Sequence, residues 1–252
     1  MQKDHEFDLT EPFNTSYFQT YYQNYRDKLE DLFDSERHFI HEFVQPRKTY
    51  LDIGCATGGM SQILSMLEPS IRYTGIDISP QMIHAAQKNY PTMQFLVYDG
   101  SHLPYPNHDF DRVLSLGTTV HDLHYETLLK EAYRVATDTL FFDIRLTHTQ
   151  KTLQSLAKAY VLDGSGVKYP YIVVNWNDFK TFLGDLDPPP SLIKGYGYWG
   201  KANTESHLPK GYETICMATF LITKGTGNTQ FHFGYQFCLA VSLPVCCHPD
   251  AG

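Results

Sequence analysis

The chain has 252 residues, 42% of them hydrophobic, and a formal net charge of −8. This length suffices for one large domain, or for a domain with an insertion. The acidic balance argues against nucleic acid as a partner, because phosphate binding needs a basic surface. The five cysteines are an odd number with irregular spacing, which predicts no disulfide framework. No apolar run approaches the roughly 20 residues of a membrane span, and the N-terminus lacks a signal core, so we expect a soluble, cytoplasmic protein without a membrane partner.

Residues 1–46 are predicted to form an N-terminal helical region. Aromatic and aliphatic residues recur there at helical spacing: Phe18, Tyr21, Tyr22, Tyr25, Leu29, Leu32, Phe33, Phe39, Ile40 and Phe43. Two interpretations stay open. The helices either pack on the sheet, which is what amphipathic aromatic patterns usually mean, or form a lid whose tyrosine hydroxyls help to close a site.

Apolar strand-like runs alternate with helical patterns between residues 47 and 144. The expected strands are Thr49–Ile53, Ile71–Ile76, Gln94–Tyr98, Arg112–Leu116 and Thr139–Ile144, and the expected helices are Gly59–Leu67, one starting at Pro80 with Ser79 as its cap, and Tyr125–Val135. Such alternation predicts an α/β fold with a doubly wound, mostly parallel sheet and helices on both faces.

The alternation loosens beyond Arg145. We expect a main domain over residues 47–224, in which 145–192 form a substrate-side insertion, with helices at Thr149–Leu162 and Trp176–Leu183. The runs Ile193–Trp199 and Glu213–Thr223 are β-rich and predict an antiparallel addition to the sheet. We expect residues 225–252 to form an accessory tail, or an edge element of the sheet if they are ordered. Its Cys246-Cys247-His248 predicts no metal site, because adjacent cysteines rarely serve one tetrahedral ion.

Three expected strands end in carboxylates, namely Asp52, Asp77 and Asp99. Ligands of a parallel sheet bind at the carboxyl ends of its strands, so the three acids are expected to face one crevice beside the glycine turn at residues 54–59. A phosphate site normally avoids surrounding carboxylates. The acids therefore favour a ligand with ribose hydroxyls, an amine and a positive centre, such as S-adenosylmethionine, over a dinucleotide.

Residues 50 to about 144 closely resemble the class I S-adenosylmethionine-dependent methyltransferases of the small-molecule type. The matching motifs are Leu51-Asp52-Ile53-Gly54-Cys55-Ala56-Thr57-Gly58, Gly75-Ile76-Asp77-Ile78-Ser79, Tyr98-Asp99-Gly100 with Leu103-Pro104 and Phe110-Asp111, and Glu131-Ala132-Tyr133-Arg134-Val135. The family's fold is a seven-stranded sheet whose last strand is antiparallel. Ala56 departs from the glycine more usual in the first motif, and Ala136-Thr137-Asp138 replaces a longer link before the fifth strand.

The resemblance implies S-adenosyl-L-methionine as cofactor, S-adenosyl-L-homocysteine as product, and a small molecule as methyl acceptor. It places the methionine part of the cofactor against Asp52 and Gly54, with Gly58 keeping the turn tight, and it includes Cys55 among the cofactor-binding residues. Asp77 would take the ribose hydroxyls and Ile78 would pack on the adenine. Asp99, beside Gly100, would accept from the adenine amine, and Leu116 would contribute main chain.

A general base is needed only for a poorly acidic acceptor. His121 is the first choice, because it follows the fourth strand and an ordinary histidine titrates near neutrality. The alternative is a loop histidine that shapes the pocket. Asp143 is a second candidate catalytic residue, although a structural pair with Arg145 fits it equally well. No metal ligands are predicted, and the oligomeric state stays open.

Two other functions stay open beside methyl transfer to an O, N or C atom. One is a nicotinamide- or nucleotide-sugar-dependent oxidoreductase on a related fold, although the turn reads G-x-A-x-x-G where such an enzyme prefers G-x-G-x-x-G. The other is a protein that binds S-adenosylmethionine without catalysis.

Overall fold

The computed structural model describes residues 26–100, 102–202, 205–226 and 228–234. The expected helical region before residue 26 and most of the expected tail, including Cys246, Cys247 and His248, lie outside these residues. Residues 230–233 of the tail form strand β12.

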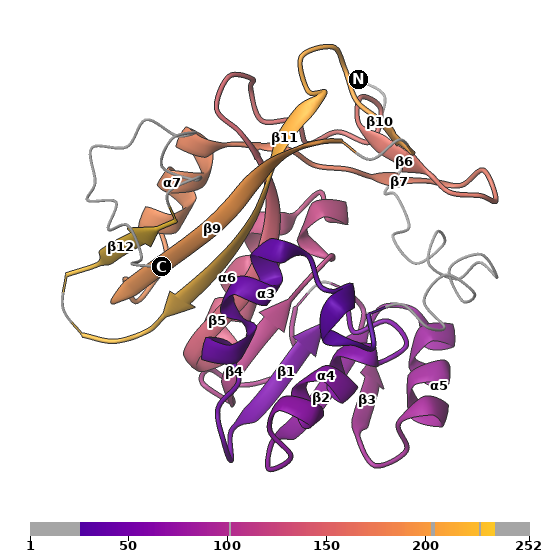
Figure 1. Cartoon of the computed structure of the whole chain (residues 1–252), viewed down its shortest axis with the longest axis vertical. Helices are drawn as coiled ribbons and strands as arrows, with labels where there is room; N and C mark the ends of the chain where they lie inside the picture. The colour runs from indigo at the N-terminus through magenta and orange to yellow at the C-terminus, as the bar shows by residue number, and fades with distance from the viewer. Residues whose placement is uncertain (1–25, 101, 203–204, 227, 235–252) are drawn as a thin grey trace.

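A mixed sheet forms the centre of the molecule (Figure 1). Seven of its strands lie in the order β3-β2-β1-β4-β5-β11-β9. Their bounds are β1 Thr49–Ile53, β2 Arg72–Asp77, β3 Gln94–Val97, β4 Phe110–Ser115, β5 Ala136–Thr147, β9 Leu192–Lys201 and β11 Thr214–Thr223. Strand β11 runs antiparallel to both of its neighbours, whereas β1 to β5 pair in parallel. The predicted fold class is confirmed. Within the described chain two short strands add to it, β12 (Gln230–Phe233) beside β9 and β8 (Val174–Asn175) beside β5.

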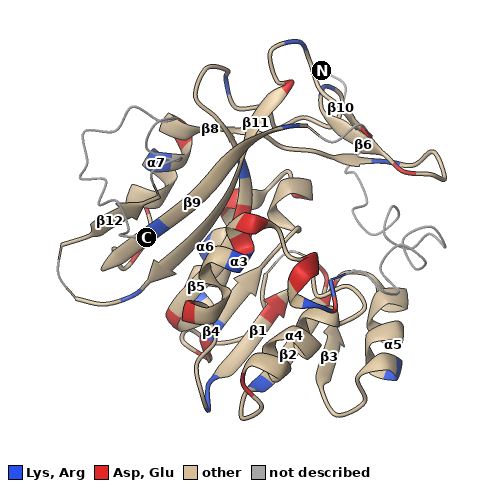
Figure 2. Cartoon of the chain, in the orientation of Figure 1, with Lys and Arg blue, Asp and Glu red and all other residues tan. Residues whose placement is uncertain are grey.

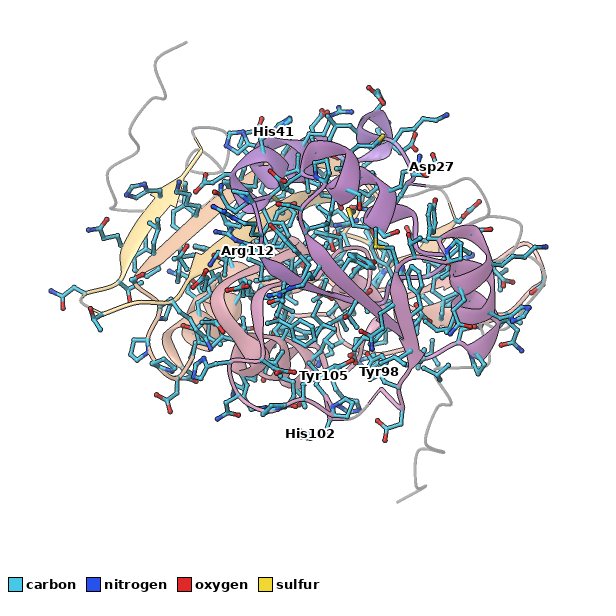
Figure 3. The ribbon with its side chains drawn as sticks, turned by 90° about the horizontal axis from the view of Figure 1, so that it is seen from below. Asp27, His41, Tyr98, His102, Tyr105 and Arg112 are labelled. Atoms are coloured by element: carbon cyan, nitrogen blue, oxygen red, sulfur yellow. The ribbon has the colours of Figure 1, made fainter. Side chains whose placement is uncertain are left out.

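Helices cover both faces of the sheet. Helices α3 (Asp34–Phe43), α4 (Gly59–Leu67) and α5 (Pro80–Asn89) pack on one face, and α6 (Tyr125–Val135) and α7 (Trp176–Gly184) pack on the other. Figure 3 views the molecule from below and shows His41 of α3 and Tyr105 of the β3–β4 loop on opposite sides of the sheet. Each face buries its own apolar cluster, so the sheet is an internal layer and its strand ends supply the surface for a site.

Local sequence accounts for several element boundaries. Ser79 caps α5 by accepting a hydrogen bond from the backbone N–H of Met82, and Pro80 occupies the first helical position. Asn175 caps α7 in the same way through the N–H of Asn177. Helix α6 ends at Val135 and β5 begins at the next residue, so the link before the fifth strand is shorter than predicted.

The prediction of a helix over Thr149–Leu162 is wrong. Residue Leu153 instead bridges Val173, and β6 (Tyr160–Leu162) pairs antiparallel with β7 (Lys168–Pro170). The apolar side chains of this stretch pack on residues 169–173 and on β11, far along the chain. Pairing with a distant segment therefore overrides the local helical pattern.

Strands β6 and β7 form a separate small sheet with β10 (Ser206–His207). Figure 1 shows this small sheet at the end of the molecule toward which β1 and β4 point. It thus stands over the carboxyl ends of the central strands, where the predicted site lies. Within the described residues no helix combines the length and the apolar character that a membrane crossing requires.

Candidate functional site

A cavity of about 480 Å³ opens at the carboxyl ends of β1, β2, β4 and β5. Its walls come from the turn after β1, the ends of β2 and β4, residue 145 of β5, the segment before α3 and the small sheet. Ligand sites of parallel sheets occur at this edge, and the volume lies within the range of small-molecule pockets.

The turn between β1 and α4 is held in left-handed backbone conformations. Gly54 has φ +77°, and a Cβ placed there would lie 1.9 Å from Oγ1 of Thr118. That hydroxyl donates to the carbonyl of Ile53 at 3.1 Å, so a side chain at residue 54 would displace the loop after β4. Gly58 has φ +86° and a Cβ there would meet the ring of Phe95. It does not line the cavity, and the ring of Phe95 leaves no space for a side chain at this position.

Ala56 occupies the position where the motif more usually has glycine. It adopts φ +46°, which is uncommon for a residue with a Cβ. Its N–H donates to Oδ2 of Asp77 at 2.9 Å. The carboxylate at the end of β2 thus holds the turn in the conformation that a glycine would adopt without strain.

Asp77 connects the glycine turn to the start of α5. Besides the bond from Ala56, its Oδ1 accepts from the N–H of Ser79 at 2.9 Å. The side chain lines the cavity and the residue is 8% exposed. Burial raises the pKa of Asp77 to about 6, against the opposing effect of these backbone donors.

Asp52 is the second carboxylate in the same wall. It is 4% exposed, and its Oδ2 accepts a 2.5 Å hydrogen bond from the hydroxyl of Tyr73. Burial raises the pKa of Asp52 to about 7; the Tyr73 bond and the charge of Arg26 lower it, and the charge of Asp77 raises it. Two desolvated carboxylates in one wall form an acidic end of the cavity that favours a positively charged ligand.

The remaining residues predicted for the cofactor lie around this acidic end. Ile78, Gly100 and Leu116 line the cavity, and Cys55 does so with a buried thiol whose pKa is raised by desolvation. Asp99 differs from the other two acids, because it is exposed and is not part of the lining, although its neighbours Tyr98 and Gly100 are. The structure therefore brings two of the three acids together and leaves the third at the margin.

His121 lines the cavity at the end of a short 3-10 turn, Thr119–His121. Its Nδ1 lies 2.7 Å from the carbonyl oxygen of Pro170, so Nδ1 carries the proton that donates there. Desolvation lowers the pKa of His121 to about 4, with the charge of Arg145 acting in the same direction. The ring is therefore neutral at neutral pH, and Nε2 is the nitrogen that can accept a proton.

Asp143 does not line the cavity. It is 1% exposed, its Oδ1 accepts from the N–H of Gly117 at 2.6 Å, and its Oδ2 accepts from Nη1 of Arg145 at 2.7 Å. Arg145 does line the cavity. The carboxylate thus positions the loop after β4 and the guanidinium.

Sequence reasoning missed the partners that fix these acids. Tyr73 lies two residues before Gly75, which pairs with Asp52 across β1 and β2. The period of two in a strand puts Tyr73 on the same face as Asp52, and this is the signal that could have identified it. Arg26, which lines the cavity and pairs with buried Glu36 at 2.7 Å, had no comparable signal. Among the described residues no group of three or more His, Cys, Asp or Glu side chains could hold a metal ion.

Comparison with known proteins agrees with this geometry. Residues 51–139 match the family model described as a methyltransferase domain. These residues are thus similar to a methyltransferase domain. The chain is 34% identical over 116 residues to a 2-methyl-6-phytyl-1,4-hydroquinone methyltransferase of Synechocystis, covering 42% of this chain and 36% of that protein. It is 31% identical over 90 residues to a phthiotriol/phenolphthiotriol dimycocerosates methyltransferase of Mycobacterium leprae, covering 35% and 33%. The chain thus spans about a third of the length of these two relatives.

A solved structure extends the similarity beyond the methyltransferase domain. A SAM-dependent methyltransferase from Methanosarcina mazei superposes with a TM-score of 0.54 at 18% identity, covering 78% of this chain and 99% of that one. At this identity the likeness concerns the fold alone. It shows that the fold of this chain outside residues 51–139 is also similar to that of the solved structure.

Proposed function

We propose that the protein is an S-adenosylmethionine-dependent methyltransferase that transfers a methyl group to an O, N or C atom of a small molecule. The observation that carries the proposal is the pair of buried carboxylates, Asp52 and Asp77, beside the left-handed turn of the methyltransferase domain. The names of the relatives give different methyl acceptors: a hydroquinone for the Synechocystis protein and a fatty acid for one from Mycolicibacterium smegmatis. The acceptor is therefore not inferred from them.

The donor and acceptor atoms of the cavity fit the cofactor. Asp77 uses one lone pair of each oxygen for the N–H groups of Ala56 and Ser79, and a carboxylate has about four acceptor sites, so ribose hydroxyls can still donate to it. Asp52 offers a negative charge to an ammonium or sulfonium. The side chains of Ile78 and Tyr98 supply apolar surface for an adenine. A dinucleotide would place phosphates beside two carboxylates, which disfavours the oxidoreductase alternative.

The sulfonium of S-adenosylmethionine supplies an already activated methyl group, so the residues of the chain have to align the acceptor and exclude water. The small sheet contributes Val161 and Tyr169 to the cavity wall. Neutral His121, fixed by Pro170, can accept a hydrogen bond or the departing proton at Nε2. Asp143 acts as a positioning residue through Gly117 and Arg145.

Calorimetric titration separates the leading function from the oxidoreductase. We expect the wild-type protein to bind S-adenosylmethionine and not NAD, and Asp77→Ala to weaken that binding at least about 10-fold, because the turn and the ribose lose a shared acceptor. Asp109→Asn, which changes an exposed acid of the β3–β4 loop outside the cavity, serves as the matched control. Tight binding of NAD with no binding of S-adenosylmethionine would contradict the proposal.

His121→Ala tests the proposed role of the histidine. We expect a loss of turnover of about 10- to 100-fold with nearly unchanged affinity for S-adenosylmethionine. His121 lines the cavity, but the hydrogen bonds that hold Asp52 and Asp77 come from other residues. His102→Ala is the control, because His102 is an exposed histidine outside the cavity that pairs with Glu131. Equal turnover of wild type and His121→Ala would leave His121 with a scaffold role only.

A further inference from the structure

The cavity has a second end with a different chemical character. Whereas the acidic end contains Asp52 and Asp77, this end contains Arg145 together with the aromatic residues Phe33, Tyr169 and Tyr171. They come from β5, the segment before α3, β7 and the residues that follow it. Parts of the chain that are distant in sequence thus build one wall around a cation.

Arg145 is almost completely buried, with 6% of its surface exposed. Nη1 donates to Oδ2 of Asp143 at 2.7 Å, but Nε is buried and has no hydrogen-bond partner among the described residues. A buried donor without an acceptor is unfavourable, and guanidinium stays charged at any physiological pH. The Nε side of Arg145 therefore lacks an acceptor oxygen.

Asp143 cannot supply that oxygen without giving up another contact. Its Oδ1 already accepts from the N–H of Gly117 at 2.6 Å, and its Oδ2 accepts from Nη1. Tyr171 interacts electrostatically with Arg145 and helps to raise the pKa of the guanidinium. The guanidinium is thus held in a fixed position next to the loop after β4, and a ligand does not have to order it.

Aromatic side chains lie beside this guanidinium and beside His121. The ring centroid of His121 lies 4.8 Å from that of Tyr169 and 6.1 Å from that of Tyr171. The guanidinium carbon of Arg145 lies 5.6 Å from the ring centroid of Phe33. Flat walls of this kind bind planar rings by stacking or edge-to-face contact.

Other charged side chains also line the cavity. Arg26 pairs with the buried carboxylate of Glu36, and Asp122 is half-buried. Lys201 and Glu205 both line the exposed mouth of the cavity and have opposite charges. In the interior, Asp143 balances the charge of Arg145 through Nη1, but Nε of Arg145 has no hydrogen-bond partner among the described residues. A planar monoanion fits that edge, because two oxygens of a carboxylate match two N–H groups of a guanidinium.

The geometry points to a small aromatic carboxylate as the methyl acceptor, with its carboxylate on the Nε side of Arg145 and its ring against the aromatic wall. This inference rests on the proposed methyltransferase function, because it names the substrate class of the same cavity. It assigns to Arg145 a role in specificity rather than in methyl transfer.

The test measures binding by calorimetry, so that it does not depend on turnover. Wild-type protein saturated with S-adenosylhomocysteine is titrated with benzoate, 4-hydroxybenzoate and cinnamate, and with the amide of each. We expect at least one acid to bind at least about 10-fold more tightly than its amide, because only the acid forms charged hydrogen bonds with the guanidinium. Equal affinity of acid and amide in all three pairs, no binding of any acid, or tighter binding of phenyl phosphate than of benzoate would overturn the inference.

A variant of Arg145 tests whether this residue causes the preference for acids over amides. Arg145→Lys keeps the charge but loses the planar fork, so we expect the acid-over-amide preference to fall about 10-fold. Arg37→Lys is the same change at an exposed arginine of α3 and should leave the preference unchanged. An unchanged preference in folded Arg145→Lys would overturn the inference; if that variant does not fold, the wild-type panel gives the result. Failure of the wild type to bind S-adenosylhomocysteine or S-adenosylmethionine would instead reject the proposed function. In that case the titrations with acids and amides are repeated in the absence of S-adenosylhomocysteine.

Discussion

Asp143→Ala is expected to lower the free energy of unfolding by about 3–5 kcal/mol, since it leaves the buried guanidinium of Arg145 without its counter-charge. The same change removes the acceptor for the N–H of Gly117, so the loop after β4 loses its link to β5. Equilibrium unfolding in urea, followed by circular dichroism, measures the effect.

An exposed ion pair of the same kind provides the control. Asp34 pairs with Arg37 on α3 and has a side chain that is 67% exposed. Because solvent screens such a pair, Asp34→Ala should cost far less than Asp143→Ala. Similar losses of unfolding free energy in the two variants would contradict the expectation that burial makes the Asp143–Arg145 pair more important for stability.

Asp52→Asn is expected to make the protein more stable and less able to bind its cofactor. The folded-state pKa of Asp52 is raised from 3.8 to about 7, so the folded protein holds this proton more tightly than the unfolded chain does. Stability contributed by this group is therefore lost as pH rises from about 4 to about 7. Asparagine cannot ionise, yet it can still accept the hydrogen bond from Tyr73.

The expected gain for Asp52→Asn at pH 8 is about 2–4 kcal/mol in the free energy of unfolding. At pH 4.5 both side chains are neutral in the folded state, so the difference between variant and wild type should largely vanish. Affinity for S-adenosylmethionine at pH 8 should fall at least about 10-fold, because a cationic ligand loses its buried counter-charge. A stability difference that is the same at both pH values would contradict the assignment of the raised pKa to Asp52.

Local patterns in the sequence predicted the part of the fold that surrounds the acidic end. The strand Thr49–Ile53 and the helices Gly59–Leu67 and Tyr125–Val135 have the predicted bounds, because each combines a clear periodicity with a glycine turn or a sharp end. The stretch 149–162 was not predictable in this way. Its partners are residues 169–173 and β11, and the pairing of distant segments leaves no local periodicity.

Some residues of the site could likewise be predicted from the sequence, and others could not. Asp52 and Asp77 were predictable, since an acid at the end of a parallel strand points to the ligand edge of the sheet. The exposure of Asp99 was not, because β3 is an edge strand and only the neighbours of Asp99, Tyr98 and Gly100, line the cavity. The buried state of Arg145 depends on Asp143, Tyr171 and Phe33, and their proximity follows only from the folded chain.

Figure 2 shows lysines and arginines scattered over several elements among the described residues of this view.

The most direct test of the central claim is methyl transfer from S-adenosylmethionine labelled in its methyl group. The full chain is incubated with the labelled cofactor and a small-molecule extract, and the products are separated and identified by mass spectrometry. The account predicts label in one or a few small molecules, with S-adenosylhomocysteine formed in equal amount. Binding of the cofactor without transfer of label to any small molecule would contradict it, and would assign the protein to the cofactor-binding proteins without catalysis.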